Sequence, residues 1–68
     1  MQTYKIEGEF IKLGQALKAA GLAESGVDAK YAVQDGNVKV NGSVETQRGK
    51  KLVPGDVVEY QGEILRIE

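Results

Sequence analysis

The chain has 68 residues, with nine Lys or Arg, ten Asp or Glu, no Cys and no His, and its net charge is −1 at neutral pH. A chain of this length forms one domain and buries only about 60% of the surface that its unfolded form exposes; without Cys or His it has no disulfide and none of the usual zinc ligands, so hydrophobic packing must hold the fold. The same absence removes the most common general base and common nucleophile arrangements, so we expect a protein that is not an enzyme and requires no metal or cofactor.

The first predicted element is a short strand over residues 3–7. Tyr4 and Ile6 alternate with polar neighbours, which is the period-two pattern of a half-buried strand. Gly8 follows and ends the pattern. We therefore expect one side of this segment to face the core.

Residues 10–20 predict the first helix, because apolar residues recur at helical spacing and Gly21 is placed to end it. Gly14 lies inside this segment, where glycine costs about 1 kcal/mol relative to alanine. Its presence indicates that another backbone approaches the helix closely. The predicted apolar face consists of Phe10, Leu13, Leu17 and Ala20.

A second helix is predicted to begin after Ser25 and to end at Gly36. Ser25 precedes Asp28 by three residues, as in a capping box with the shorter acid. Only residues 22–25 separate the two helices, so we expect them to pack as an αα corner. Lys30 lies off the apolar face and is free for solvent or a ligand. That apolar face consists of Ala29, Ala32 and Val33.

The remaining elements are predicted to be two β-hairpins. Asn41-Gly42 is a strong hairpin signal because both residues tolerate positive φ. It follows a predicted strand over residues 38–40 and precedes a return strand that starts with residues 43–45. A loop over 47–56 ends in a Pro-Gly turn, and residues 57–67 form the second hairpin across Gln-Gly. The predicted fold class is therefore α+β, with two packed helices forming an αα corner against a small antiparallel sheet in a single domain over 1–68.

Charge is distributed unevenly along the chain. Residues 39–51 hold four basic residues and one Glu, a local charge of +3, whereas residues 56–68 hold four acidic residues and one Arg, a local charge of −3. The low overall charge argues against a uniformly basic nucleic-acid binder. Basic residues gathered around one turn and one loop instead indicate a polyanionic partner that contacts one face only.

Four segments, FIKLGQALKAAGL, SGVDAKYAV, GNVKVNGSVETQRGKKL and PGDVVEY, together resemble the S-four RNA-binding domain, most closely its small stand-alone bacterial form. The resemblance covers about 11–62. It implies an L-shaped surface (the αL motif), made by the two helices and the following turn, that binds structured RNA through shape and phosphate contacts. The implied partner is ribosomal RNA or tRNA, with the ribosome as a further candidate and a role in translation.

The resemblance also implies which residues contact RNA. Gln47 stands where relatives often have an arginine, and Val27 where they often have a second glycine, so we expect weaker binding than is usual in the family. The implied contacts are Ser25, Gly26, Lys30, Asn41, Gly42, Arg48, Lys50 and Lys51, with Lys12, Lys18, Lys39 and Gln47 as secondary candidates.

Three other functions fit parts of the pattern. A hairpin-type DNA-binding regulator would explain VNG and PGDVVEY but not the two helices, and a β-grasp sulfur carrier requires a C-terminal Gly-Gly where this chain ends LRIE. A protein-interaction module that uses the acidic C-terminal hairpin remains open. No apolar run approaches the roughly 20 residues that span a bilayer, and the first residues do not resemble an export signal, so we expect a soluble, cytoplasmic monomer without a membrane partner.

Overall fold

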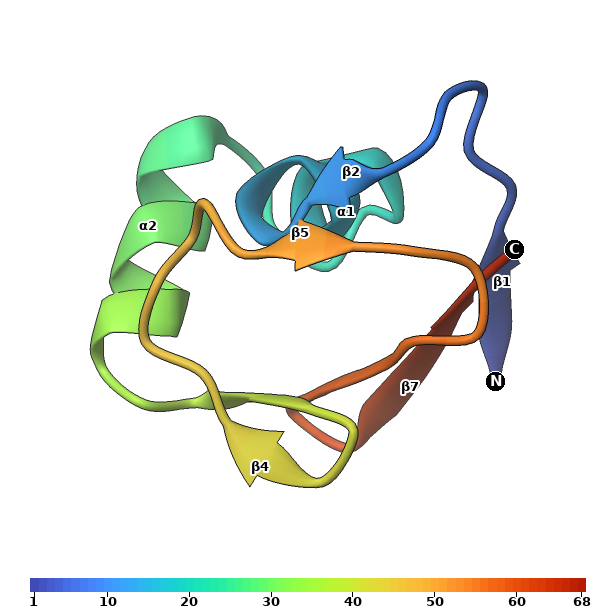
Figure 1. Cartoon of the computed structure of the whole chain (residues 1–68). Helices are drawn as coiled ribbons and strands as arrows, with labels where there is room; N and C mark the ends of the chain where they lie inside the picture. Colours follow the sequence, from blue (N-terminus) through green and yellow to red (C-terminus); the bar gives the residue numbers. More distant parts are fainter.

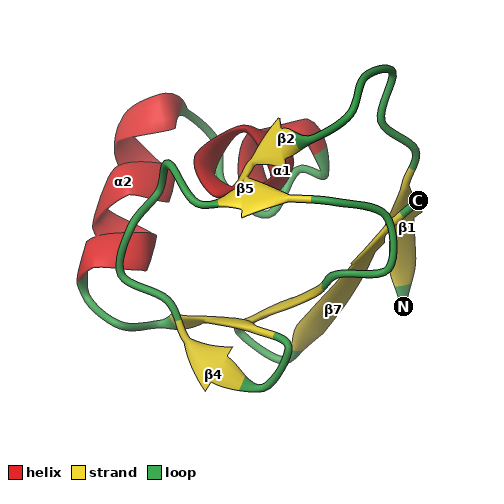
Figure 2. Ribbon diagram, in the orientation of Figure 1, coloured by secondary structure: helices red, strands yellow, loops and turns green.

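The computed structural model describes residues 1–68 and consists of two helices packed on one face of a five-stranded sheet, with a separate two-stranded sheet beside the first helix (Figures 1 and 2). The five strands lie in the order β1-β7-β6-β3-β4. In chain order the elements are β1 (Gln2–Tyr4), β2 (Ile11–Lys12), α1 (Leu13–Ala19), α2 (Gly26–Gln34), β3 (Val38–Val40), β4 (Ser43–Val44), β5 (Lys51–Leu52), β6 (Val57–Tyr60) and β7 (Glu63–Ile67). The predicted α+β class is confirmed.

The sheet is mixed rather than wholly antiparallel, because β1 runs parallel to β7. This differs from the prediction, which gave the first strand no partner. The Ile6 N–H donates to the Glu68 carbonyl and the Glu68 N–H to the Tyr4 carbonyl, both at 2.8 Å. The first and last strands therefore lie side by side at one sheet edge (Figure 1). Tyr4 and Ile6 are half-buried, as their alternation predicted.

The first helix is shorter than predicted and begins at Leu13 instead of residue 10. Residues 11 and 12 are extended and pair with β5, so part of the predicted loop over 47–56 is also a strand. Phe10 is 42% exposed and does not belong to the helix face. Apolar spacing alone did not reveal this, because the strand partner of residues 11 and 12 lies about 40 residues further along the chain.

The second helix and both hairpin turns are confirmed. The Asp28 N–H donates to Ser25 Oγ at 3.2 Å, so Ser25 is the N-cap of α2. Both residues of each two-residue turn have positive φ, 52° and 85° at Asn41-Gly42 and 52° and 78° at Gln61-Gly62. This is the geometry of type I′ turns, which match the twist of paired antiparallel strands.

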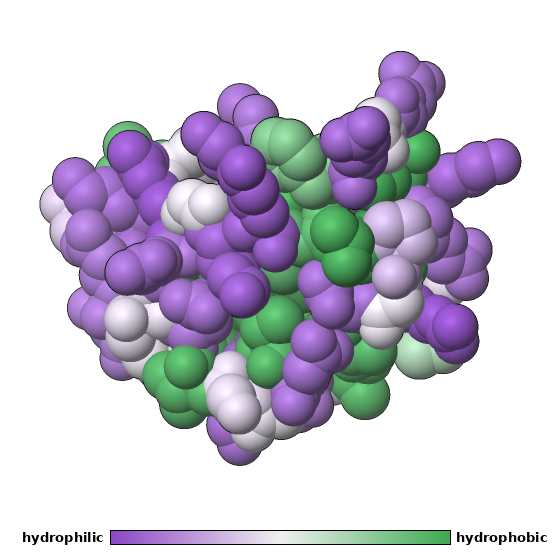
Figure 3. All heavy atoms as spheres, in the orientation of Figure 1, coloured by the Kyte–Doolittle hydropathy of each residue, from purple (hydrophilic) through white to green (hydrophobic).

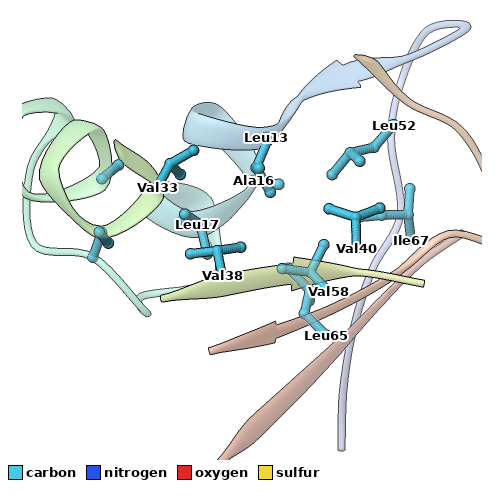
Figure 4. Packing of buried hydrophobic residues seen from close by; sticks show 13 residues of the cluster. Leu13, Ala16, Leu17, Val33, Val38, Val40, Leu52, Val58, Leu65 and Ile67 are labelled. Atoms are coloured by element: carbon cyan, nitrogen blue, oxygen red, sulfur yellow. The ribbon is translucent and has the colours of Figure 1, made fainter. Parts of the chain in front are cut away.

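The core lies between the helices and the sheet (Figure 4). All thirteen buried residues are apolar, so any binding function must reside in surface groups. In the space-filling view, apolar atoms occupy the middle of the face, where the ribbon shows open space between β5 and the large sheet (Figure 3). No helix is long and apolar enough to cross a bilayer. The buried residues include Leu13, Leu17, Val33, Val38, Leu52, Val58, Leu65 and Ile67.

Candidate nucleic-acid interface

The loop that contains Arg48 and Lys50 is fixed to the start of α1 by backbone contacts. The Leu13 N–H donates to the Lys50 carbonyl at 2.8 Å, and the Gly14 N–H donates to the Arg48 carbonyl at 2.9 Å. These bonds satisfy two of the N–H groups that a helix start leaves without internal partners. A Cβ at Gly14 would lie 3.4 Å from the Arg48 Cβ and 3.5 Å from its carbonyl oxygen. The predicted close approach of another backbone at Gly14 is confirmed.

A shallow groove of about 370 Å³ opens where this loop meets the two helices. Three of its lining residues are basic and none is acidic, whereas the whole chain carries a slight negative charge. Three others are glycines, which leave the backbone accessible to a ligand. We call this feature the basic groove; its lining residues are Lys12, Gly14, Gln15, Lys18, Gly26, Arg48 and Gly49.

The N-terminus of α2 reaches the basic groove through Gly26. Ser25 Oγ accepts from the Asp28 N–H, while the N–H groups of Gly26 and Val27 make no backbone hydrogen bond. Apart from its chain neighbours and the backbone of α2, no atom lies within 4 Å of the place where a Cβ at Gly26 would stand. Because free N–H groups at a helix start attract anions, this end of the groove suits a phosphate.

The structure brings together some of the predicted contacts. Gly26 and Arg48 line the basic groove, and so do the secondary candidates Lys12 and Lys18. Lys51 is the cross-strand partner of Lys12 and therefore borders the groove.

Other predicted residues flank the groove. The Lys50 carbonyl accepts a hydrogen bond from the start of α1. The Lys50 side chain is exposed, so its ammonium is accessible to a ligand. Half-buried Lys30 lies one helical turn after Gly26, on the same side of α2.

Eight of the twelve predicted contacts do not line the basic groove: Ser25, Lys30, Lys50 and Lys51 belong to the elements that border it, and four others form a separate group. Lys39 is on β3, opposite Glu59 of β6, and lines a second depression, of about 280 Å³, that also contains Glu63. That depression has both signs of charge and does not favour a polyanion. The other three members of this group are Gln47, Asn41 and Gly42.

The Asn41 side chain has an internal role. Its Nδ2 donates to Asp56 Oδ1 at 3.0 Å, and its Oδ1 accepts from the Val57 N–H at 2.9 Å. Asp56 Oδ2 in turn accepts from the Val53 N–H at 2.8 Å. This network, which we call the turn network, joins the first hairpin to the Pro-Gly turn. An RNA contact through Asn41 therefore competes with bonds that hold the fold.

The acidic C-terminal segment is less available than its sequence indicated. The Asp56 carboxylate belongs to the turn network. Glu59 faces Lys39 across the sheet, where opposite charges attract. Of the four acidic residues in 56–68, only Glu63 and Glu68 are exposed and have neither a place in a hydrogen-bond network nor a basic residue paired opposite them. The case for an acidic protein-docking hairpin is correspondingly weaker.

Sequence reasoning missed Gln15, Gly14 and Gly49 as lining residues of the basic groove. Gly14 was recognised as a site of close approach, but nothing in the sequence identified what approaches it. Gln15 Oε1 accepts from the Lys12 N–H at 3.3 Å, which places this side chain at the start of α1. No periodicity distinguishes Gln15 from any other exposed helical glutamine.

The basic groove, the αα corner and the adjoining hairpin together have the architecture of a small αL-type domain. The chain belongs to the S4 domain family, whose family model matches residues 4–68. This is the S-four domain that the motifs resemble, and both helices lie within the matched residues. A hairpin-type regulator, which assigns no role to the helices, is therefore excluded as the family of this chain.

The chain is similar to two bacterial proteins over 57 residues, 84% of its length. One is YbcJ from Escherichia coli strain K12, which is named as a candidate RNA-binding protein. It is 40% identical to this chain, and the match covers 81% of YbcJ. The other is RlbA from Bacillus subtilis strain 168, which is named as a candidate ribosome maturation protein. It is 46% identical to this chain, and the match covers 80% of RlbA.

Two solved structures share the fold. The solution structure of E. coli YbcJ, described as having an αL motif involved in RNA binding, superposes with a TM-score of 0.75 at 37% identity, covering 98% of this chain and 86% of YbcJ. Ribosomal protein S4e of Thermoplasma acidophilum superposes with a TM-score of 0.74 at 23% identity, over 88% of this chain and 32% of S4e. At that identity, S4e supports the fold alone.

Proposed function

We propose that this protein binds structured RNA through the basic groove and acts by binding rather than by chemistry. The observation that carries the proposal is the groove itself, whose lining combines three cations with Gly26 at the start of α2 and contains no acidic residue, in a chain of net charge −1. Membership of the S4 domain family and the description of the YbcJ αL motif support the same partner.

The groove favours recognition by shape and phosphate rather than by base sequence. Lys12, Lys18 and Arg48 supply ionic contacts, and the N–H of Gly26 supplies a directed donor. Such groups bind phosphate oxygens and fix the position of the nucleic acid without reading its bases. The one lining side chain with an amide, Gln15, already accepts a bond from the Lys12 N–H. Little sequence preference is expected.

Ribosomal RNA is the RNA that we propose as the partner, in an assembling or mature ribosome. The name of the B. subtilis relative RlbA, which refers to ribosome maturation, supports this choice over tRNA. Lys30, Lys50 and Lys51 would extend the contact beyond the groove on the same face. Ser25 would act indirectly, by capping α2 and so presenting its free N–H groups.

The test compares two double variants that remove the same charge. Lys18→Gln/Arg48→Gln alters the basic groove, and Lys39→Gln/Arg66→Gln alters β3 and β7 of the large sheet. Binding to labelled ribosomal RNA and tRNA is measured by fluorescence anisotropy from 50 to 300 mM salt. Each lost phosphate contact should reduce the slope of log K against log salt by about 0.9.

The groove variant should lose about two units of salt slope and bind much more weakly at low salt, whereas the sheet variant should resemble the wild type. Circular dichroism must show both variants folded. Equal losses in the two variants would show that diffuse attraction accounts for binding. A flat salt response of the wild type would contradict a phosphate-binding groove, and stronger binding to tRNA than to ribosomal RNA would contradict the choice of RNA.

A further inference from the structure

The outer face of the β2–β5 ladder places two lysines directly opposite each other. Lys12 pairs with Lys51 in register, while Ile11 and Leu52 form the neighbouring pair, with Leu52 fully buried. Cross-strand partners point to the same face, and like charges in this position are destabilising. Both lysines are exposed, so they share the face that points away from the core.

Lys12 is also an unfavourable residue for the start of α1. It is the N-cap residue of α1, and its side chain accepts no capping hydrogen bond. The start of a helix carries partial positive charge and attracts anions, so a cation there is disfavoured. Serine, threonine, aspartate and asparagine are the residues that stabilise an N-cap. Neither local stability nor helix formation therefore explains a lysine at this position.

The aromatic ring of Phe10 lies beside the other lysine of the pair. The Lys51 ammonium lies 4.8 Å from the centroid of the Phe10 ring, a cation–π distance. Phe10 is 42% exposed and contributes little to the core. A ring on one side of an ammonium leaves N–H donors on the other side, since the ammonium has three.

We propose that Lys12 and Lys51 clamp one backbone phosphate of the bound RNA, with Phe10 as the positioning residue of the Lys51 ammonium. A phosphate between the two ammonium groups replaces their repulsion by two attractions. Lys12 also lines the basic groove, so the clamp continues the groove and extends the RNA path along β2 and β5. The inference rests on the proposed RNA-binding function and specifies part of its surface.

The first experiment measures the repulsion without RNA. Lys12→Gln is made in the wild type and in a Lys51→Gln background, and each melting temperature is measured at 20 mM and 1 M NaCl. At low salt, Lys12→Gln should raise the melting temperature of the wild type by about 1 to 5 °C. The gain should be smaller in the Lys51→Gln background, and the difference between backgrounds should vanish at 1 M salt. Lys5→Gln, at another exposed lysine, is the matched control and should leave the melting temperature unchanged at both salt concentrations.

The second experiment measures binding of the same variants to labelled ribosomal RNA. Lys12→Gln and Lys51→Gln should each weaken binding and reduce the salt slope by about 0.9. Phe10→Leu should weaken binding about two- to fivefold, and Phe10→Trp should restore it because indole also attracts cations. In the Lys51→Gln background, Phe10→Leu should have no further effect.

Equal low-salt gains from Lys12→Gln in both backgrounds would overturn the clamp, since no repulsion would then link the two lysines. An equal loss from Phe10→Leu with and without Lys51 would overturn the role of Phe10. RNA binding that depends on Lys18 and Arg48 but not on Lys51 would refute the clamp and leave the proposed function intact. Absence of wild-type RNA binding would instead refute the proposed function.

Discussion

Asn41→Gly separates a structural role of Asn41 from an RNA contact. Asn41 has φ +52°, which glycine adopts freely, so the substitution removes the side chain without straining the turn. Lost with it are the bond from Nδ2 to Asp56 at 3.0 Å and the bond from the Val57 N–H at 2.9 Å. The backbone bond from the Asn41 N–H to the Val57 carbonyl at 2.8 Å remains available.

The expected cost follows from these two hydrogen bonds. Each is worth about 0.5 to 1.5 kcal/mol, and both lie near the surface, where water replaces part of the lost interaction. We therefore expect Asn41→Gly to lower the free energy of unfolding by about 1 to 2 kcal/mol. For a domain of this size, the melting temperature should fall by about 5 to 15 °C. Asn41→Ala should cost about 1 kcal/mol more, because alanine at positive φ is strained.

Thermal melts followed by circular dichroism measure the cost, and fluorescence anisotropy with ribosomal RNA at 10 °C measures binding. If the turn network accounts for Asn41, the variant is less stable but binds RNA with nearly unchanged affinity while folded. Asp56→Ala should lower stability similarly, and the double variant should cost less than the sum of the two. An unchanged melting temperature together with lost RNA binding would refute this reasoning and restore Asn41 as an RNA contact.

Three further predictions concern the helices. Leu17→Ala, at a fully buried position, should cost about 2 to 4 kcal/mol in urea unfolding, whereas Lys30→Ala should leave stability nearly unchanged; similar losses would show the helix faces to be misassigned. Gly14→Ala should be tolerated because its Cβ fits 3.4 Å from Arg48, but Gly14→Val should displace the loop and weaken RNA binding; equal RNA affinity of both variants would contradict the close approach. Ser25→Ala should cost about 1 kcal/mol, measured by the same urea titration, and a neutral result would mean that the 3.2 Å cap bond adds nothing.

Local signals in the sequence determined most of the elements. Ser25 and the apolar face of the second helix were sufficient to place α2, because a cap and a helical period are encoded within about ten residues. Asn41-Gly42 and Gln61-Gly62 fixed both hairpins for a similar reason, since a two-residue turn with positive φ joins only strands that are neighbours in the chain. The family resemblance is likewise carried by ordered motifs in the sequence.

Contacts between distant parts of the chain decided the rest. The N-terminus of α1 depends on β5, a partner about 40 residues away, so residues 10–12 followed tertiary pairing instead of their apolar period. The pairing of β1 with β7 likewise joins opposite ends of the chain.

The proposed binding surface also depends partly on local sequence and partly on contacts between distant residues. The sequence by itself determined that positive charge gathers in residues 39–51, because charge is a property of composition. Only the tertiary structure showed that Lys12 and Lys18 join Arg48 in one groove, while Lys39 lies elsewhere, opposite Glu59. The physical reason is that a groove is formed by packing: the bond from the Gly14 N–H to the Arg48 carbonyl places the loop against α1, and no local pattern encodes that contact.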